Sequence, residues 1–197
     1  MLNELLISLT IFEPFRITNE VFNDVRGGFS PFNFAKDFSD FNIYQLNTVT
    51  TKEPYTFRGM HWQEPPYAQG KLIRCTLGKI IDFAVDIRGG SPNFGKSYGF
   101  VLSSPQEWVF IPRGFAHGYI TLPHNLGDTY PTTVEYLVDN HYNPESERGM
   151  FMTKEINDCI STELPNGIIN IIFNERDLNW PTISEIETNF RYEPEEQ

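Results

Sequence analysis

The sequence has little of three things: cysteine, basic charge and long apolar runs. Its only cysteines, Cys75 and Cys159, form no CxxC motif, which is typical of reduced thiols, so we expect a cytoplasmic protein. Lysine and arginine number 15 against 26 acidic residues, a formal net charge of −11. Nucleic acids and anionic membranes need clustered basic residues, so we expect neither as a partner. No 18 consecutive apolar residues occur, which argues against a membrane-spanning helix.

Short apolar or alternating runs, separated by breaks rich in glycine and proline, are what the sequence does contain. The N-terminal apolar stretch lacks the basic region and cleavage site of a signal peptide, and we interpret it as a strand. Strands spaced in this way predict an all-β sandwich or barrel, formed by a single domain over residues 1–197. The predicted strands are residues 6–12, 43–50, 72–77, 80–87, 97–102, 108–111, 119–122 and 133–138.

The run at residues 80–87 carries two acids, Asp82 and Asp86. Because strand side chains alternate, both carboxylates should lie on one face, with Phe83, Val85 and Ile87 on the other. Periodicity alone favours a solvent-exposed face for the two acids.

The pattern weakens beyond Pro144. Residues 155–174 are interpreted as an added hairpin or a turn and strand. We treat about 152–173 as an insertion and 182–197 as a C-terminal tail.

One group of polar residues has the types needed for proton chemistry on a phosphorylated substrate. RGMHWQ at 58–63 and QGK at 69–71 place Arg58, His61 and Lys71 near one predicted hairpin. An arginine suits a diphosphate, a histidine a general base, and a lysine the oxygen of an enolate. Spacing alone leaves equally open that these are unrelated polar residues in loops.

A second motif, IPRGFAHGY at 111–119, resembles the second half of the cupin signature. The first half, which supplies most metal ligands in metal cupins, is missing, so that only His61 and His117 remain as candidates. Two imidazoles make a poor site for a catalytic metal, and we expect no metal. His124 and His141 are interpreted as surface histidines.

Several motifs in order resemble the dTDP-4-dehydrorhamnose 3,5-epimerase family. They are DVRG at 24–27, RGMHWQ at 58–63, AQGKL at 68–72, DFAVDIR at 82–88, SPNFG at 91–95 and IPRGFAHG at 111–118. The resemblance runs from about residue 12 to 149. It implies a cupin-type jelly roll, or double-stranded β-helix, with a few short helices. It also implies a homodimer formed by strand exchange and a reaction without metal or other cofactor.

The resemblance also implies roles for individual residues. His61 would be the base that removes protons from C3 and C5, Lys71 would hold the C4 oxygen, and Tyr136 would be the acid on the opposite side. Arg58 would bind the diphosphate together with Arg26 of the partner subunit.

Further positions are implied around this centre. Tyr142 would lie near the nucleotide base, and Gln45 and Asn47 would line the pocket. His117 would border the substrate pocket, and Asp82 or Asp86 would lie behind the residues that contact the substrate.

The resemblance weakens after Gly149, where Met152 stands in place of a family tryptophan and a longer connection precedes Trp180. The family then has an LSxKD-type motif whose Asp orients the base. The stretch ISEIE at 183–187 offers Glu187 at that place. Alternatively, Glu187 is a surface residue and His61 contacts Asp82 or Asp86. We predict that one of these three carboxylates lies within hydrogen-bonding reach of His61.

These residues predict an isomerase that acts on a nucleotide-activated 4-keto-6-deoxy sugar of the dTDP-4-dehydro-6-deoxyglucose type. A C4 ketone acidifies the hydrogens at C3 and C5, so a base and an acid on opposite faces can invert either carbon through an enolate. Such a step belongs to rhamnose and polysaccharide biosynthesis. The alternatives are a non-catalytic sugar-nucleotide-binding cupin, a related 3-epimerase or ketoisomerase, and, with least support, a metal cupin.

Overall fold

The computed structural model describes residues 13–33, 38, 41–124, 131–163 and 170–193 of the chain. The strand expected at residues 6–12 lies outside them. The strands are β1 (Phe15–Thr18), β2 (Phe22–Asp24), β3 (Gly27–Phe29), β4 (Gln45–Thr51), β5 (Phe57–Gln63), β6 (Lys71–Leu77), β7 (Lys79–Asp86), β8 (Ser97–Leu102), β9 (Glu107–Ile111), β10 (Phe115–Leu122), β11 (Thr132–Val138) and β12 (Glu147–Gly149). The helices are α2 (Lys154–Glu163) and α3 (Glu175–Leu178).

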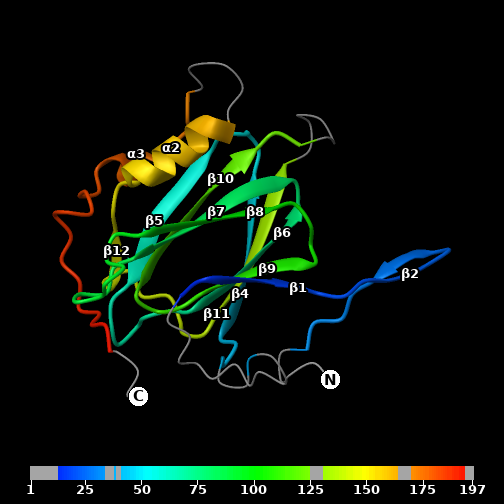
Figure 1. Cartoon of the computed structure of the whole chain (residues 1–197), viewed down its shortest axis with the longest axis horizontal. Coiled ribbons are helices and arrows are strands. Elements are labelled where there is room, and N and C mark those ends of the chain that lie inside the picture. The colour runs from blue at the N-terminus through cyan, green and yellow to red at the C-terminus, as the bar shows by residue number, and fades with distance from the viewer. Residues whose placement is uncertain (1–12, 34–37, 39–40, 125–130, 164–169, 194–197) are drawn as a thin grey trace.

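Two five-stranded sheets face each other (Figure 1). One has the strand order β1-β9-β6-β11-β4 and the other β12-β5-β10-β7-β8, and every pair is antiparallel. Apart from β7 and β8, neighbours in each sheet are not consecutive in sequence, as in a jelly roll. The predicted all-β barrel is confirmed, and the expected strands from residue 43 onward are all present, with bounds shifted by a few residues.

Both sheets are covered on both faces. Ile73, Val109, Tyr119 and other side chains of the inner faces fill the space between the sheets. The outer face of the β5-β10-β7 sheet packs against α2 and the C-terminal segment, and that of the other sheet against Phe38 and Phe41. A strand such as β7 is consequently buried along nearly its whole length.

This double coverage corrects the expectation for Asp82 and Asp86. Their alternation with Phe83 and Val85 is as predicted, but both carboxylates are fully buried. The odd-numbered side chains of β7 (Ile81, Phe83 and Val85) face α2, while the even-numbered ones face the interior between the sheets. Periodicity separates the two faces of a strand but does not say which face meets water.

Residues 154–163 form the helix α2, so the predicted hairpin or turn and strand is wrong for this part. Ile156 and Ile160 are buried against the sheet, and the helical spacing of these residues outweighs the turn-like sequence that follows. Past the helix, Ile172 makes a parallel bridge with Thr56 beside β5. Within the described residues, no helix is long and apolar enough to cross a membrane.

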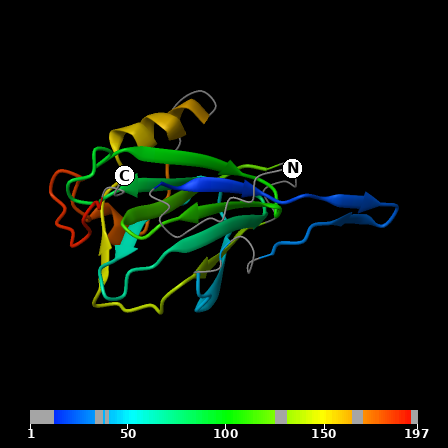
Figure 2. The same cartoon turned by 60° about the horizontal axis from the view of Figure 1, so that its bottom comes forward.

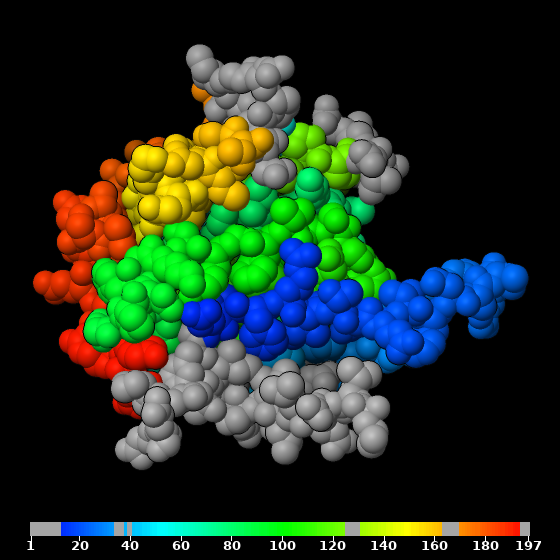
Figure 3. Space-filling model, in the orientation of Figure 1, coloured from blue at the N-terminus to red at the C-terminus, as the bar shows by residue number. Residues whose placement is uncertain are grey.

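The hairpin β2-β3 extends away from the barrel (Figures 2 and 3). Val25 at its turn is fully exposed, and Phe22 and Phe29 are more than half exposed. Within one chain, this hairpin therefore leaves apolar side chains without cover.

Candidate active site

A cavity of about 490 Å³ opens between the two sheets. Polar side chains from both sheets line it, together with the segment that leads into α3. The lining side chains that can carry charge or transfer a proton are Arg58, His61, Lys71, His117, Tyr119 and Tyr136.

A bulge in β5 directs Arg58 and His61 to the same cavity. His117 pairs with His61 and Tyr119 with Arg58, so two steps along β10 correspond to three along β5. Gly59 supplies the extra residue with φ of +127°, which side chains rarely adopt. A Cβ on Gly59 would lie 2.5 Å from Cα of Gly118, so only glycine fits between the two strands.

His61 forms a dyad with Asp177. Nε2 of His61 lies 2.8 Å from Oδ1 of Asp177, whose side chain is almost completely buried. Burial alone would raise the pKa of Asp177, but hydrogen bonds from His61 and the backbone of Gly59, with the charge of Arg176, hold it below its ordinary value. Because an ionised carboxylate can only accept, Nε2 of His61 is the donor in this contact, and Nδ1 is the acceptor atom of the neutral imidazole.

The prediction for the carboxylate behind His61 is therefore right in kind and wrong in residue. Glu187 is exposed and lines a separate cavity with Glu64 and Arg191. Asp86 pairs with Arg88 and Ser91 inside the barrel, and Asp82 contacts His117 instead.

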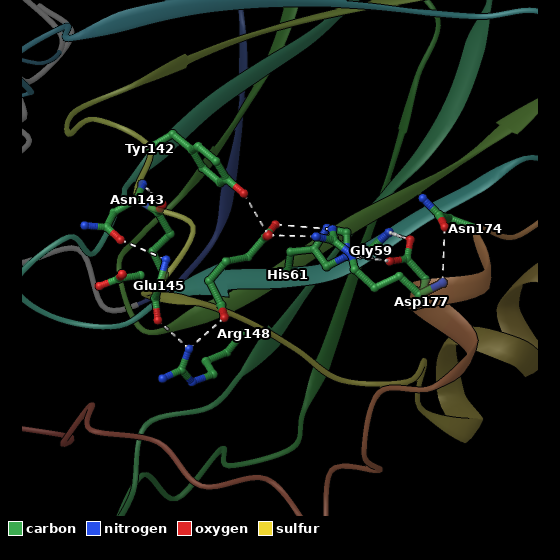
Figure 4. Close-up of polar contacts among 11 residues, drawn as sticks. Gly59, His61, Tyr142, Asn143, Glu145, Arg148, Asn174 and Asp177 are labelled. Atoms are coloured by element: carbon green, nitrogen blue, oxygen red, sulfur yellow. Dashed lines mark hydrogen bonds and ion pairs between the residues drawn. The ribbon is translucent and has the colours of Figure 1, made fainter.

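The sequence contains a motif for Asp177 that the prediction of Glu187 overlooked. The string FNERD at 173–177 has the LSxKD spacing with a similar residue at each defined position, and it precedes Trp180 rather than following it. Asn174 caps α3 by accepting a hydrogen bond from the backbone N–H of Arg176 (Figure 4). An Asn followed by acidic residues is a helix-start pattern that points to this segment.

Arg176 joins the dyad to a second group of polar residues. Its Nη1 lies 2.8 Å from Oε2 of Glu147, and its Nε lies 3.7 Å from Oδ1 of Asp177. The hydroxyl of Tyr142 donates to the same Glu147 oxygen at 2.9 Å, on the other side of the carboxylate (Figure 4). Glu147 thus holds Arg176 in place at the edge of the cavity.

His117 is paired with Asp82. Nε2 of His117 lies 2.7 Å from Oδ1 of Asp82. Burial lowers the pKa of His117 and outweighs the opposing effect of Asp82, so the imidazole is mainly neutral at pH 7. His61 and His117 each have a single carboxylate partner, and the described residues contain no group of three or more His, Cys, Asp or Glu side chains arranged around a metal position.

Lys71 and Tyr136 complete the polar lining. Burial lowers the pKa of Lys71 to about 8, although Asp82 and Glu147 favour its charged form. Burial raises the pKa of Tyr136, so its phenol stays protonated at neutral pH. Tyr136 is on β11 and His61 on β5, in facing sheets.

The other predicted site residues lie around or away from this cavity. Arg58 lines it and donates from Nε to the Thr51 hydroxyl at 3.2 Å. Gln45 and Asn47 are hydrogen-bonded to each other on β4, beyond the cavity lining. Arg26 lies on the projecting hairpin, where it pairs with Asp24 and is 86% exposed.

The arrangement can transfer protons on both sides of one substrate. A base backed by a carboxylate stands on one wall, a protonated phenol on the facing wall, and an ammonium group beside them. These are the three groups that a proton exchange through an enolate requires.

Comparisons with known proteins agree with this geometry. The sequence profile of the dTDP-4-dehydrorhamnose 3,5-epimerase family matches residues 8–185. A dTDP-4-dehydrorhamnose 3,5-epimerase from Sinorhizobium fredii is 36% identical over 190 residues, which cover 94% of this chain and 92% of the relative.

Solved structures are similar over nearly the whole chain. The dTDP-6-deoxy-D-glucose-3,5-epimerase of Legionella pneumophila, in complex with dTDP-4-keto-L-rhamnose, gives a TM-score of 0.76 at 27% identity and covers 94% of this chain and 96% of its own. The dTDP-4-dehydrorhamnose 3,5-epimerase of Bacillus anthracis, with TDP and pyrophosphate bound, gives 0.73 at 30% identity and covers 89% and 97%.

Proposed function

This chain belongs to the dTDP-4-dehydrorhamnose 3,5-epimerase family, and we propose that it is the isomerase that inverts C3 and C5 of a dTDP-linked 4-keto-6-deoxy sugar. The observation that carries the proposal is the His61–Asp177 dyad, which shares one cavity with Lys71 and Tyr136. A non-catalytic protein that only binds sugar nucleotides would not require a histidine paired with a buried carboxylate.

The mechanism follows from the proton positions. Nδ1 of His61 takes the hydrogen from C3 or C5, and the electron pair of the broken C–H bond moves toward the C4 oxygen. Lys71, charged at neutral pH because its pKa is about 8, stabilises that oxygen. As the enolate returns to the ketone, the carbon accepts the phenolic proton of Tyr136 on its opposite face. Solvent removes the proton from His61 and returns one to Tyr136 before the next carbon reacts.

The cations near the cavity suit the diphosphate of the substrate. Arg58 is held by Thr51 with its terminal nitrogens available to a ligand. We propose that Arg26 of the partner subunit adds a second guanidinium, because the β2-β3 hairpin carries it away from its own barrel. The exposed Phe22 and Phe29 would be covered in such a homodimer.

The remaining features fit the same proposal. We propose that Tyr142, at the outer side of Glu147, contacts the nucleotide base, and that Gln45 and Asn47, beyond the cavity lining, extend the binding site along β4. We take residues 1–197 as one catalytic domain in which the insertion at about 152–173 carries α2 and leads to Asp177. Cys75 is a buried thiol, which supports a cytoplasmic site for this step of rhamnose and polysaccharide biosynthesis.

The decisive experiment is incubation with dTDP-4-keto-6-deoxyglucose in heavy water, followed by NMR. We expect deuterium at both C3 and C5. Incorporation at one carbon alone would identify a mono-epimerase, and no incorporation with intact binding would favour the non-catalytic alternative.

A further inference from the structure

Tyr119 stands in a row of polar side chains that crosses three strands. In the strand register, Tyr119 of β10 is opposite Arg58 of β5 on one side and Asp82 of β7 on the other. Directly opposed residues of antiparallel strands point to the same face. All three side chains are therefore directed into the space between the sheets, and Arg58 and Tyr119 both reach the cavity.

The Tyr119 hydroxyl is a buried polar group without a hydrogen-bond partner among the described residues. The Thr51 hydroxyl lies near the Tyr119 hydroxyl but not at hydrogen-bonding geometry, and it already accepts from Nε of Arg58. His117, the other polar neighbour on the same strand, is paired with Asp82. Buried hydroxyls in folded proteins nearly always have a hydrogen-bond partner. A buried hydroxyl without one has lost its hydrogen bonds to water and gained none in return. A hydroxyl that lines an open cavity can find that partner in a ligand.

The Tyr119 side chain is otherwise well packed. The residue is 4% exposed and belongs to the inner core cluster with Ile73 and Val134. Burial raises the pKa of Tyr119 well above its ordinary value, against smaller opposing effects of Arg58 and Thr51. The hydroxyl thus keeps its proton and is held in one place as a donor, so binding would require little additional ordering of the side chain.

We infer that Tyr119 is a ligand-binding residue whose hydroxyl donates a hydrogen bond to an oxygen of the bound sugar nucleotide, beside Arg58. The identity of the ligand rests on the proposed function. The acceptor oxygen belongs either to the diphosphate that Arg58 binds or to a hydroxyl of the attached sugar. Tyr119 is distinct in role from Tyr136, because it fixes the substrate and transfers no proton to carbon.

The test is Tyr119→Phe, which removes one oxygen and leaves the packed ring in place. Titration calorimetry should show an approximately tenfold weaker affinity for the ligand that supplies the acceptor. The KM for dTDP-4-keto-6-deoxyglucose should rise by a similar factor, while kcat stays within about threefold. The melting temperature should be unchanged or higher, since a buried group without a partner is removed.

Tyr98→Phe is the matched control. The Tyr98 hydroxyl is also buried, and its ring packs against the same core cluster, but it does not line the cavity. This variant should bind and turn over the substrate as the wild type does.

Two ligands separate the possible acceptors. If Tyr119→Phe weakens the binding of both dTDP and the sugar nucleotide, the acceptor belongs to the diphosphate. If it weakens the binding of the sugar nucleotide but not that of dTDP, the acceptor belongs to the sugar. Unchanged affinity for both would overturn the inference. If the wild-type protein bound dTDP through Tyr119 but exchanged no deuterium, the proposed function would fail while this inference stood.

Discussion

Oδ1 of Asp177 lies 2.8 Å from Nε2 of His61, and the two residues are 116 positions apart in the chain. The contact joins the short helix α3 to β5, which lies between β12 and β10 in its sheet. In the proposed reaction the carboxylate fixes the tautomer of the imidazole and compensates the positive charge that the imidazole gains with the substrate proton. The predictions below follow from this dyad and from the groups around it.

Asp177→Asn should fold normally and lower kcat by about 10²–10⁴-fold, because an amide can orient His61 but cannot stabilise its positive charge. Steady-state kinetics and circular dichroism would measure the two effects. Glu187→Gln is the control, since Glu187 is exposed and lies in a different cavity, and it should retain full activity. A normal kcat for Asp177→Asn, or a loss confined to Glu187→Gln, would contradict the assignment.

His61→Asn and Tyr136→Phe should fail in different ways. Without the base no enolate forms, so His61→Asn should abolish deuterium exchange while affinity for dTDP stays within about threefold. Without the acid the enolate still forms, so Tyr136→Phe should keep exchange and lose net inversion. NMR in heavy water separates the two. Loss of both exchange and inversion in Tyr136→Phe would mean that Tyr136 has another role.

The pH dependence should report Lys71. Burial lowers its pKa to about 8, so the ammonium is present at neutral pH and is lost as the pH rises through that value. We therefore expect kcat/KM to fall on the alkaline side with an apparent pKa of about 8. Lys71→Arg, if active, should remove this alkaline limb, because a guanidinium keeps its charge. An unchanged limb in that variant would assign the titration to another group.

Gly59→Ala should damage both stability and activity. The new Cβ would lie 2.5 Å from Cα of Gly118, at a φ of +127°, and we expect a loss of about 2 kcal/mol or more in the free energy of unfolding. Because the bulge directs His61 into the cavity, kcat should also fall. Gly90→Ala is the control, with positive φ but nothing within 4 Å; it should lose only about 1 kcal/mol and remain active. Equal behaviour of the two variants would argue against a role for the close approach.

Mixed dimers should test the contribution of Arg26. Arg26→Ala and His61→Asn chains, co-expressed with different tags, should each be nearly inactive alone. If Arg26 serves the neighbouring site, the purified heterodimer has one intact site and should recover about half of the wild-type activity. A dimer without this recovery would show that Arg26 does not act across the interface, and an active monomer in sedimentation would refute the dimer itself.

The sequence by itself determined the all-β class, the positions of most strands from residue 43 onward and most of the polar groups that line the cavity. The strands follow from local rules, namely strand periodicity and turn residues. The polar groups were assigned to one site by the family resemblance, because spacing alone left their relation open. Periodicity also separated Asp82 and Asp86 correctly from the apolar positions of β7.

Only the tertiary structure decided which carboxylate supports His61 and which face of β7 is buried. Asp177 reaches His61 because α2 covers the sheet and the following segment pairs beside β5, a route that no short-range pattern specifies. Asp82 is buried because the second sheet covers a face that would otherwise meet water. Burial and hydrogen-bond partners at these positions depend on contacts between segments distant in sequence, and local spacing carries no information about which segments meet.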